Sequence, residues 1–212
     1  MGCIYDSGEF ERGMDMALEL ADWDGFAARR AEAEARGMLR GIGVANYVEN
    51  AAGWPMERAE TEVRAHGRID LIIGTQASGQ GHETVFAQMV SDFLQVPFEA
   101  VTLRTGDTDF VKMGAGSHSS RSMRLGGHLF KQAADGVIAK GKRVAARELE
   151  AALADIEYGN GSFRVAGTDR ALDLFAVSRI EQLHELAEVT KSIHAFPNGT
   201  HVAEVAVDPD RQ

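Results

Sequence analysis

The chain has 212 residues, of which 44% are hydrophobic and 25% are charged, a composition typical of a globular protein rather than a disordered one. Its formal net charge of −10 argues against nucleic acid or an anionic membrane as the main partner, because phosphate-rich surfaces bind basic patches. The single cysteine, Cys3, excludes an internal disulfide and a cysteine-built metal site and is expected to be a free thiol. The sequence shows neither a membrane-spanning apolar run nor a signal-peptide pattern, so we expect a cytoplasmic protein.

The first 39 residues predict two helices. The first is expected to begin at Ser7 as the N-cap, and residues 22–25 (DWDG) interrupt the pattern. A second helix, rich in alanine, arginine and glutamate, is expected to end at Gly37. Its opposite charges, about four residues apart, indicate a solvated face. The apolar residues of the first helix fall on one face: Phe10, Met14, Ala17, Leu18 and Ala21.

The middle of the chain switches to a period of two, which predicts strands over residues 40–49, 58–65 and 67–73, with a hairpin turn at residues 66–68. A helix with a clear apolar stripe then begins near Gly81 and ends before Pro97.

The remaining elements follow in chain order. We expect a strand at 100–104, one or two helices over 121–154 with a possible break at 140–142, a hairpin at Asn160-Gly161, a helix at 174–186 and a strand at 200–207.

This order predicts an α+β fold of mixed, largely antiparallel sheets with packed helices in two lobes. The first lobe, residues 1–66, would hold the helical pair and the first strands. The second, residues 67–212, would hold two glycine-rich loops and the long helix.

The two glycine-rich strings are residues 74–83 (GTQASGQGHE) and 114–122 (GAGSHSSRS). Each is expected to lead from a loop into a helix, where free backbone N–H groups and the positive end of the helix dipole attract anions. Two such junctions, separated by one helix and one strand, predict a cradle for a large, polar, phosphate-bearing cofactor.

In the first string, Gln80 lies between Gly79 and Gly81 and is the side chain that the loop presents. Its amide can donate to an oxygen and accept from a ring N–H without net charge. The string lacks the Gly-Lys-Ser/Thr of a P-loop and the spacing of a Rossmann fingerprint. A metal site built from His82, His118 and His128 is an open alternative, although no carboxylate or thiolate pattern supports it.

The second string offers small hydroxyl side chains that can donate to an oxygen or a ring nitrogen, and Arg121, which can either pair with phosphate or brace the loop. No Gly-x-Ser-x-Gly nucleophile elbow occurs here, so the serines are interpreted as a hydrogen-bonding lining. A tight glycine-serine turn without a ligand remains open. The serines are Ser117, Ser119, Ser120 and Ser122.

The chain resembles part of the large, molybdenum-binding subunit of the xanthine dehydrogenase, aldehyde oxidase and aerobic carbon monoxide dehydrogenase family. The resemblance covers nearly the whole chain, and its motifs are specific in combination. They are YDSGEFE at Tyr5, DGFAARRAEAEARG at Asp24, RGIGVANYVE at Arg40, GTQASGQGHETVFAQM at Gly74, GDTD at Gly106, GAGSHSSRSM at Gly114 and FPNGTHVAEVAVDP at Phe196.

The resemblance implies oxidative hydroxylation of an aldehyde, an N-heterocycle or a similar small molecule, with water as the oxygen source. It implies molybdenum held by a pterin, in bacteria molybdopterin cytosine dinucleotide, and not by protein ligands. Iron–sulfur and FAD cofactors on partner subunits or domains would accept the electrons.

Residue by residue, Gln80 matches the glutamine that hydrogen-bonds the molybdenum's oxygen ligand. Ser78, Gly79 and Gly81 match positions beside it at the pterin, and Ser119, Ser120 and Ser122 match the loop that contacts the pterin and the dinucleotide.

Two parts of the family's site are missing from this sequence. The glutamate base of the family is expected beyond Gln212 and an earlier cofactor loop before Met1, so we expect no catalytic residue here and an inactive isolated chain. Residues 208–210 (DPD) predict a turn towards a strand that the sequence lacks, which indicates a piece of a longer protein whose exposed apolar ends self-associate. The alternative is a standalone, non-catalytic module that binds a nucleotide or assembles with partners. The role of His118 stays open.

Overall fold

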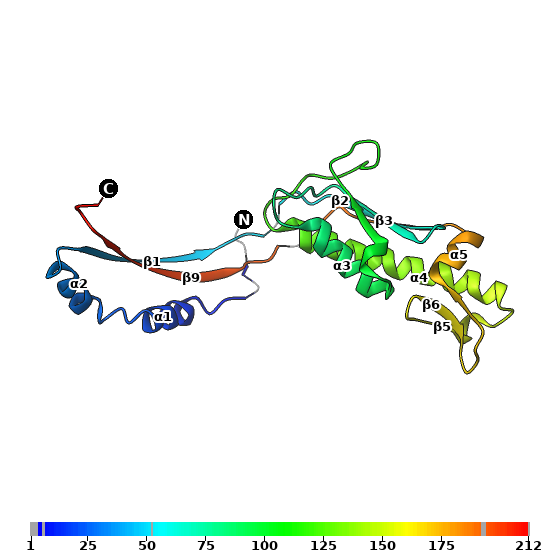
Figure 1. Cartoon of the computed structure of the whole chain (residues 1–212), viewed down its shortest axis with the longest axis horizontal. Coiled ribbons are helices and arrows are strands. Elements are labelled where there is room, and N and C mark those ends of the chain that lie inside the picture. Colours follow the sequence, from blue (N-terminus) through cyan, green and yellow to red (C-terminus); the bar gives the residue numbers. More distant parts are fainter. Residues whose placement is uncertain (1–3, 6, 52, 192–193, 212) are drawn as a thin grey trace. The chain divides into compact units, whose positions relative to one another are not determined.

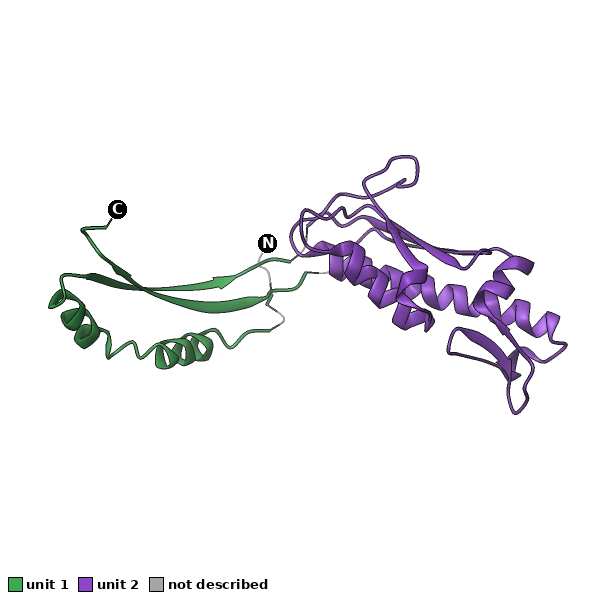
Figure 2. Ribbon diagram, in the orientation of Figure 1, with its two compact units in different colours: residues 1–51, 194–212 green, residues 52–193 purple. Residues whose placement is uncertain are grey.

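A computed structural model describes residues 4–5, 7–51, 53–191 and 194–211, so the expectation for Cys3 lies outside the described residues. The chain divides into two compact units (Figure 2): unit 1 comprises residues 1–51 and 194–212, and unit 2 comprises residues 52–193. This division differs from the expected boundary between residues 66 and 67. The reason is that the first strand pairs with the last strand of the chain and not with the second.

Unit 1 is a two-stranded antiparallel ladder with two helices along one face (Figure 1). Strand β1 (Leu39–Val48) pairs with β9 (Asn198–Val207) along its whole length, from Leu39 opposite Val207 to Val48 opposite Asn198. Helix α1 (Phe10–Leu20) packs on β9, and α2 (Phe26–Glu34) packs on β1. The final strand therefore has a partner, although that partner lies far away in the sequence.

The helix ends of unit 1 show one correction and one agreement. Glu9, and not Ser7, occupies the N-cap of α1, without a side-chain hydrogen bond to the helix. Gly37 follows α2 with φ +75°, and its N–H donates to the carbonyl of Glu34, which is the expected glycine stop. Arg30 and Glu34 pair on the exposed face of α2, as their spacing predicts.

Unit 2 is built on a four-stranded sheet in the order β4-β3-β2-β8, in which only β3 and β4 are parallel. Helices α3 (His82–Leu94) and α4 (His128–Glu148) pack against this sheet and against each other. The four strands are β2 (Glu57–Arg64), β3 (Arg68–Ile73), β4 (Val101–Arg104) and β8 (Leu183–Val189).

Shorter elements complete unit 2. A small antiparallel sheet in the order β5-β6-β7 packs by its first two strands against α4, and the Asn160-Gly161 turn joins those two strands as expected. The remaining elements are β5 (Ile156–Gly159), β6 (Ser162–Val165), β7 (Ala171–Asp173), α5 (Leu174–Ile180), the 3₁₀ turns Phe98–Ala100 and Leu153–Asp155, and the π-helical turn Ser122–Gly127.

One helix prediction in unit 2 was wrong in extent, and for another the structure decides between the one helix and the two helices that the sequence left open. The helix expected at 174–186 ends at Ile180, and residues 183–189 form the edge strand β8. Leu183 and Ala187 are both buried, and a spacing of four residues suits an inward face of either a helix or a strand. Helix α4 runs without a break through Gly141, whose missing side chain makes room for Phe163: a Cβ atom there would lie 2.1 Å from the Phe163 ring.

The hydrophobic core of unit 2 lies between the four-stranded sheet and the two long helices. Phe86 of α3 and Phe130 of α4 are fully buried, with ring centroids 5.1 Å apart. Leu71 and Ile73 of β3 face them from the sheet side. The expected α+β architecture of mixed and antiparallel sheets with packed helices is confirmed. Within the described residues, no helix combines the length and apolarity required to cross a membrane.

Candidate functional site

The two glycine-rich strings meet where β3 ends. Gly74 follows Ile73 directly, and a Cβ atom on Gly74 would lie 2.3 Å from the Cα of Gly114. Only glycine allows two backbones to approach this closely. The strings, 40 residues apart in the sequence, are therefore in direct backbone contact, as the cradle hypothesis requires.

A buried ion pair clamps this junction. The side chains of Arg121 and Glu57 are both fully buried, and Nη1 of Arg121 donates to Oε2 of Glu57 over 2.7 Å. The same guanidinium donates to the carbonyl oxygens of Trp54, Met56 and Gly116 at 2.6–3.0 Å.

The other carboxylate oxygen of Glu57 accepts the N–H of Gly74 over 3.2 Å, so the pair links both strings. Of the two roles that the sequence left open for Arg121, the geometry supports bracing, because these bonds occupy four of the five N–H donors and none of the side chain is exposed.

A hollow of about 430 Å³ opens between the two strings. Helix α3 contributes its first turn, and the second string and the π-helical turn contribute the opposite wall. None of the residues that line it is acidic, which suits an anionic ligand. The lining residues are Gln80, His82, Val85, Ser117, His118, Ser119, Ser120, Ser122 and Met123.

Hydrogen bonds orient the amide of Gln80 in this hollow. The backbone N–H of Ser78 donates to Oε1 of Gln80, and because an N–H can only donate, this contact identifies the oxygen. Nε2 of Gln80 donates to Oγ of Ser117 over 3.2 Å, and Ser117 Oγ lies 2.8 Å from Ser122 Oγ. The amide nitrogen has two hydrogens, so one is left for a ligand oxygen.

The backbone around Gln80 and the serines is open and shaped for close approach. Gly79, Gly81 and Gly116 have φ values of +112°, +74° and +75°, and a Cβ placed on any of them would have no heavy atom within 4 Å beyond the glycine itself and its adjoining residues. Ser119 and Ser120 adopt left-handed φ values of +47° and +56°, which are uncommon for residues with a side chain and concentrate at functional sites.

The N-terminus of α3 adds backbone donors to the site. Gly81 occupies the N-cap position without any side-chain hydrogen bond to the helix, and glycine has no side chain to satisfy the first N–H groups. Helix α3 runs for 13 residues, so its positive end carries a substantial dipole. This end of the helix favours an anion.

Two histidines line the hollow in different ways. His82 is 7% exposed, and its Nδ1 lies 3.1 Å from the carbonyl oxygen of Thr75, while its ring packs on Phe86. His118 is exposed at the rim, with Nδ1 3.4 Å from Oγ of Ser119. His128 instead contacts Gln132 on α4. No group of three or more metal-ligating side chains occurs in the part of the chain that the structure describes, so the histidine metal site gains no support.

Four of the seven residues expected at the cofactor line this hollow: Gln80, Ser119, Ser120 and Ser122. Ser78, Gly79 and Gly81 adjoin it without lining it, and Ser78 orients Gln80. Sequence reasoning did not assign Val85 and Met123 to the site. The sequence indicated His82 only for the alternative metal site, and Val85 lies one helical turn after it; Met123 directly follows Ser122, which was expected at the cofactor.

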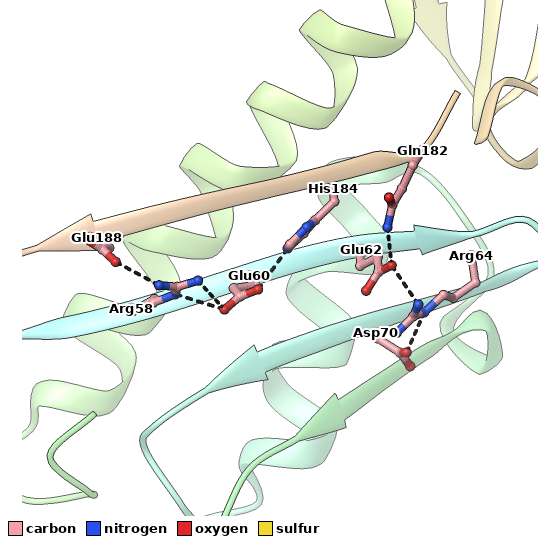
Figure 3. A network of polar contacts seen from close by, with 8 residues as sticks. All are labelled: Arg58, Glu60, Glu62, Arg64, Asp70, Gln182, His184 and Glu188. Atoms are coloured by element: carbon pink, nitrogen blue, oxygen red, sulfur yellow. Dashed lines mark hydrogen bonds and ion pairs between the residues drawn. The ribbon is translucent and has the colours of Figure 1, made fainter. Parts of the chain in front are cut away.

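A larger hollow of about 710 Å³ is lined in part by Glu62, Arg64, Asp70 and Gln182 of the four-stranded sheet and its flank. These residues belong to the polar network that Figure 3 shows. In this network every carboxylate of the sheet has cationic or amide donors. Glu60 accepts from Arg58 and contacts His184, Glu62 accepts from Arg64 and Gln182, and Asp70 accepts from Arg64. Because these charges are already paired, we assign the network to the fold and place the candidate site at the glycine-rich strings.

Comparisons with known proteins identify the family of the chain. The family profile described as the molybdopterin cofactor-binding domain matches residues 16–212. The chain is 31% identical to the 6-hydroxypseudooxynicotine dehydrogenase complex subunit gamma of Paenarthrobacter nicotinovorans, over 97% of the chain and 28% of that relative. It is 28% identical to the carbon monoxide dehydrogenase large chain of Hydrogenophaga pseudoflava, over 98% of the chain and 29% of that relative.

Solved structures give the same result. Quinoline 2-oxidoreductase from Pseudomonas putida 86 superposes with a TM-score of 0.79 at 27% identity, over 99% of the chain and 30% of that structure. A Cu,Mo-CO dehydrogenase superposes with a TM-score of 0.78 at 25% identity, over 98% of the chain and 30% of that structure. The chain thus spans less than a third of the length of these relatives. It belongs to the molybdopterin cofactor-binding domain family.

Proposed function

We propose that this chain forms part of the molybdenum-cofactor site of a molybdenum hydroxylase that oxidises an aldehyde, an N-heterocycle or a similar small molecule with oxygen from water. The observation that carries the proposal is the hollow itself: a space without carboxylates, lined by amide and hydroxyl groups, between two glycine-rich strings in backbone contact. The cofactor, when bound, supplies the two-electron redox chemistry.

The residues present fit a large anionic cofactor. The free N–H hydrogen of Gln80 and the hydroxyl groups of Ser119, Ser120 and Ser122 would hold its oxygen and ring-nitrogen atoms. The open backbone at Gly79 and Gly81, next to Ser78, would let it approach the N-terminus of α3. Val85 and Met123 would exclude water from the ring faces.

We further propose the cytosine dinucleotide form of molybdopterin, with iron–sulfur and FAD cofactors on partner subunits or domains in the cytoplasm. The printed names of the relatives, a complex subunit gamma and a large chain, support the assignment to a multi-subunit enzyme. We assign no general base within residues 1–212. The 212-residue chain is therefore expected to give no turnover of aldehydes or N-heterocycles with an artificial electron acceptor.

The test is cofactor capture by the 212-residue chain in a host that makes molybdopterin. After purification, the pterin is oxidised to its fluorescent derivative and molybdenum is measured by mass spectrometry. The variant Gln80→Glu keeps the acceptor for Ser78 but replaces the donor with a carboxylate. We expect a pterin content that is lower by roughly tenfold or more, because a hydrogen bond to a charged ligand contributes about 1.5–3 kcal/mol and the new carboxylate would also repel an anionic cofactor.

Gln88→Glu makes the same chemical change at an exposed position of α3 outside the hollow and should leave the pterin content unchanged. The proposal is rejected when the unaltered chain carries no pterin. It is also rejected when the two variants carry equal amounts.

A further inference from the structure

We infer that Nε2 of His82 is a hydrogen-bond acceptor in this hollow and that it receives a ring N–H of the bound pterin. The inference rests on the proposed function, because it names the partner of one more residue at the same site. It gives His82 a role in orienting the cofactor ring, beyond the helix start that its position on α3 suggests.

The hydrogen bond to Thr75 decides which ring nitrogen of His82 carries the hydrogen. Nδ1 lies 3.1 Å from the carbonyl oxygen of Thr75, and a carbonyl oxygen can only accept, so Nδ1 carries the hydrogen. Thr75 is itself fully buried, which keeps this bond out of competition with water. A neutral imidazole with its hydrogen on Nδ1 presents a lone pair at Nε2.

The other ring nitrogen of His82, Nε2, lies in a largely buried side chain that lines the hollow. The His82 side chain is more than nine-tenths buried, and its ring packs on Phe86 with centroids 5.3 Å apart. Nε2 has no hydrogen-bond partner among the described residues, yet it does not belong to their polar atoms that are closed off from solvent without a bond. Because His82 lines the hollow, we infer that this nitrogen is open to it.

The rest of the lining presents hydrogen-bond donors beside this acceptor. Gln80 presents an amide N–H, and the backbone N–H groups at the start of α3 are donors as well. Nε2 of His82 is an acceptor without a hydrogen of its own, so it requires a donor from the ligand. The ring edge of a pterin carries N–H hydrogens beside acceptor nitrogen and oxygen atoms, and it therefore matches this mixed set.

The apolar side chains favour a flat ligand at the same place. Val85 lies one helical turn after His82, and Met123 lines the hollow from the π-helical turn, so both can pack on a ring whose edge meets Nε2. A phosphate group would require hydrogen-bond donors, and packing against these apolar side chains would desolvate its charge without compensation. This arrangement favours the pterin ring over the phosphates as the partner of His82.

The test uses two pteridines and three variants of the 212-residue chain. Pterin carries a ring N–H at N3 and an exocyclic amino group, whereas 1,3-dimethyllumazine has methyl groups at both pyrimidine-ring nitrogens and no N–H. Affinities are measured by fluorescence titration at pH 7, where pterin keeps its ring N–H. For the unaltered chain we expect pterin to bind roughly 2- to 12-fold more tightly than dimethyllumazine, the ratio that one neutral hydrogen bond contributes.

The variants separate the two nitrogens of His82. His82→Asn keeps a donor for Thr75 but has no atom at the position of Nε2, so the preference for pterin should disappear. His82→Gln reaches as far as Nε2 and should retain the preference. His128→Asn changes an exposed histidine outside the hollow and should behave as the unaltered chain. Nitrogen NMR of the imidazole adds an independent readout, in which Nε2 is unprotonated and shifts on addition of pterin.

The possible failures are distinguishable. If the chain binds both pteridines equally, or if Nε2 carries the hydrogen, the role of His82 is refuted while the cofactor site stands. If the chain binds neither pteridine and also captures no molybdopterin in the host, both this inference and the proposed function are refuted.

Discussion

The two units differ in the side chains on the sheet face that their helices leave uncovered. In unit 2 the helices cover one face, and the other face carries the paired charges of Figure 3, in which Glu60, Glu62 and Asp70 are at most 8% exposed beneath arginine side chains. In unit 1 the helices also cover one face, but the other presents Leu39 and Val205, each 58% exposed, and Val207 at 51%. A sheet face is stable in water when its polar groups are solvated or paired. An apolar sheet face is more stable when another protein surface packs on it.

The cores differ in the same direction. Unit 2 buries a continuous cluster that includes Phe86, Phe130 and Phe163 at 0% exposure. Among the described residues of unit 1, the buried hydrophobic side chains are Ala33, Ala51 and Phe196, and α1 has none. Unit 1 therefore depends on ladder hydrogen bonds and ion pairs, which stabilise a two-stranded sheet only modestly. Unit 2 is expected to carry most of the stability of the chain.

Each unit contains one of the two tryptophans, Trp23 in unit 1 and Trp54 in unit 2, so each can be followed separately. With Trp23→Phe, the fluorescence of Trp54 reports the unfolding of unit 2. With Trp54→Phe, Trp23 reports unit 1. Both single-tryptophan proteins are unfolded with urea, so that the stability of each unit is measured separately.

The largest effect is expected at the buried ion pair of unit 2. Arg121→Met leaves Glu57 charged, buried and without its cation, and should lower the free energy of unfolding by about 3–5 kcal/mol. The Trp54 transition should move to lower urea while the Trp23 transition stays in place.

The double variant Arg121→Met, Glu57→Leu should recover part of that loss, because no unpaired charge remains. Arg147→Ala removes an exposed arginine that pairs with Glu148 and serves as the control. A loss below about 1 kcal/mol for Arg121→Met, the value typical of surface pairs, would contradict the bracing role.

The next largest effect is expected when one helical glycine of each unit is replaced by alanine. Gly141→Ala in α4 places a Cβ atom 2.1 Å from the ring of Phe163 and should destabilise unit 2 by about 1–3 kcal/mol through overpacking. Gly13→Ala in α1 meets no atom within 4 Å and should stabilise unit 1 by about 0.5–1 kcal/mol. Effects of the same sign in both units would show that the packing contrast is wrong.

The apolar face of unit 1 should promote self-association of the 212-residue chain. Leu39→Lys combined with Val205→Lys places two charges on that face and should shift sedimentation towards the monomer at high protein concentration. The control is Leu153→Lys with Ile180→Lys, which changes two isolated exposed apolar residues of unit 2. If the control pair shifts sedimentation towards the monomer equally well, the added positive charge in general causes the shift, and the apolar face of unit 1 is not the site of self-association.

The smallest effect concerns pH. Arg29 donates to both carboxylate oxygens of Glu204 on β9, and this hydrogen bonding is the main cause that lowers the pKa of Glu204. A lowered pKa in the folded state stabilises unit 1 above the ordinary glutamate pKa of about 4.3, and this contribution is lost as the pH falls through the lowered value. The midpoint of the Trp23 transition should therefore move to lower urea concentration on acidification.

Glu204→Gln should flatten this acid dependence of unit 1. Glu181→Gln, which removes an exposed partner of Arg147 in unit 2, should leave it unchanged. An equally steep acid dependence in Glu204→Gln would assign the effect to other carboxylates.

The sequence by itself determined the local features of this protein. The switch from a helical period to a period of two located β1, β2 and β3 within one or two residues, because alternation reports which side chains face a core. Gly79, Gln80 and Gly81 identified the first loop, since glycine on both sides of one polar side chain is a property of the backbone that requires no partner. The resemblance then supplied the family, and the profile match over residues 16–212 confirmed it.

Only the tertiary structure decided which distant groups meet. The pairing of β9 with β1 and the conversion of residues 183–189 into an edge strand depend on which hydrogen-bonding edges remain open after the other elements have packed. The clamp between Arg121 and Glu57 and the bond from His82 to Thr75 join groups whose sequence context allows several partners. Local propensity acts over a few residues, whereas burial selects among distant partners, and that selection created the hollow around Gln80.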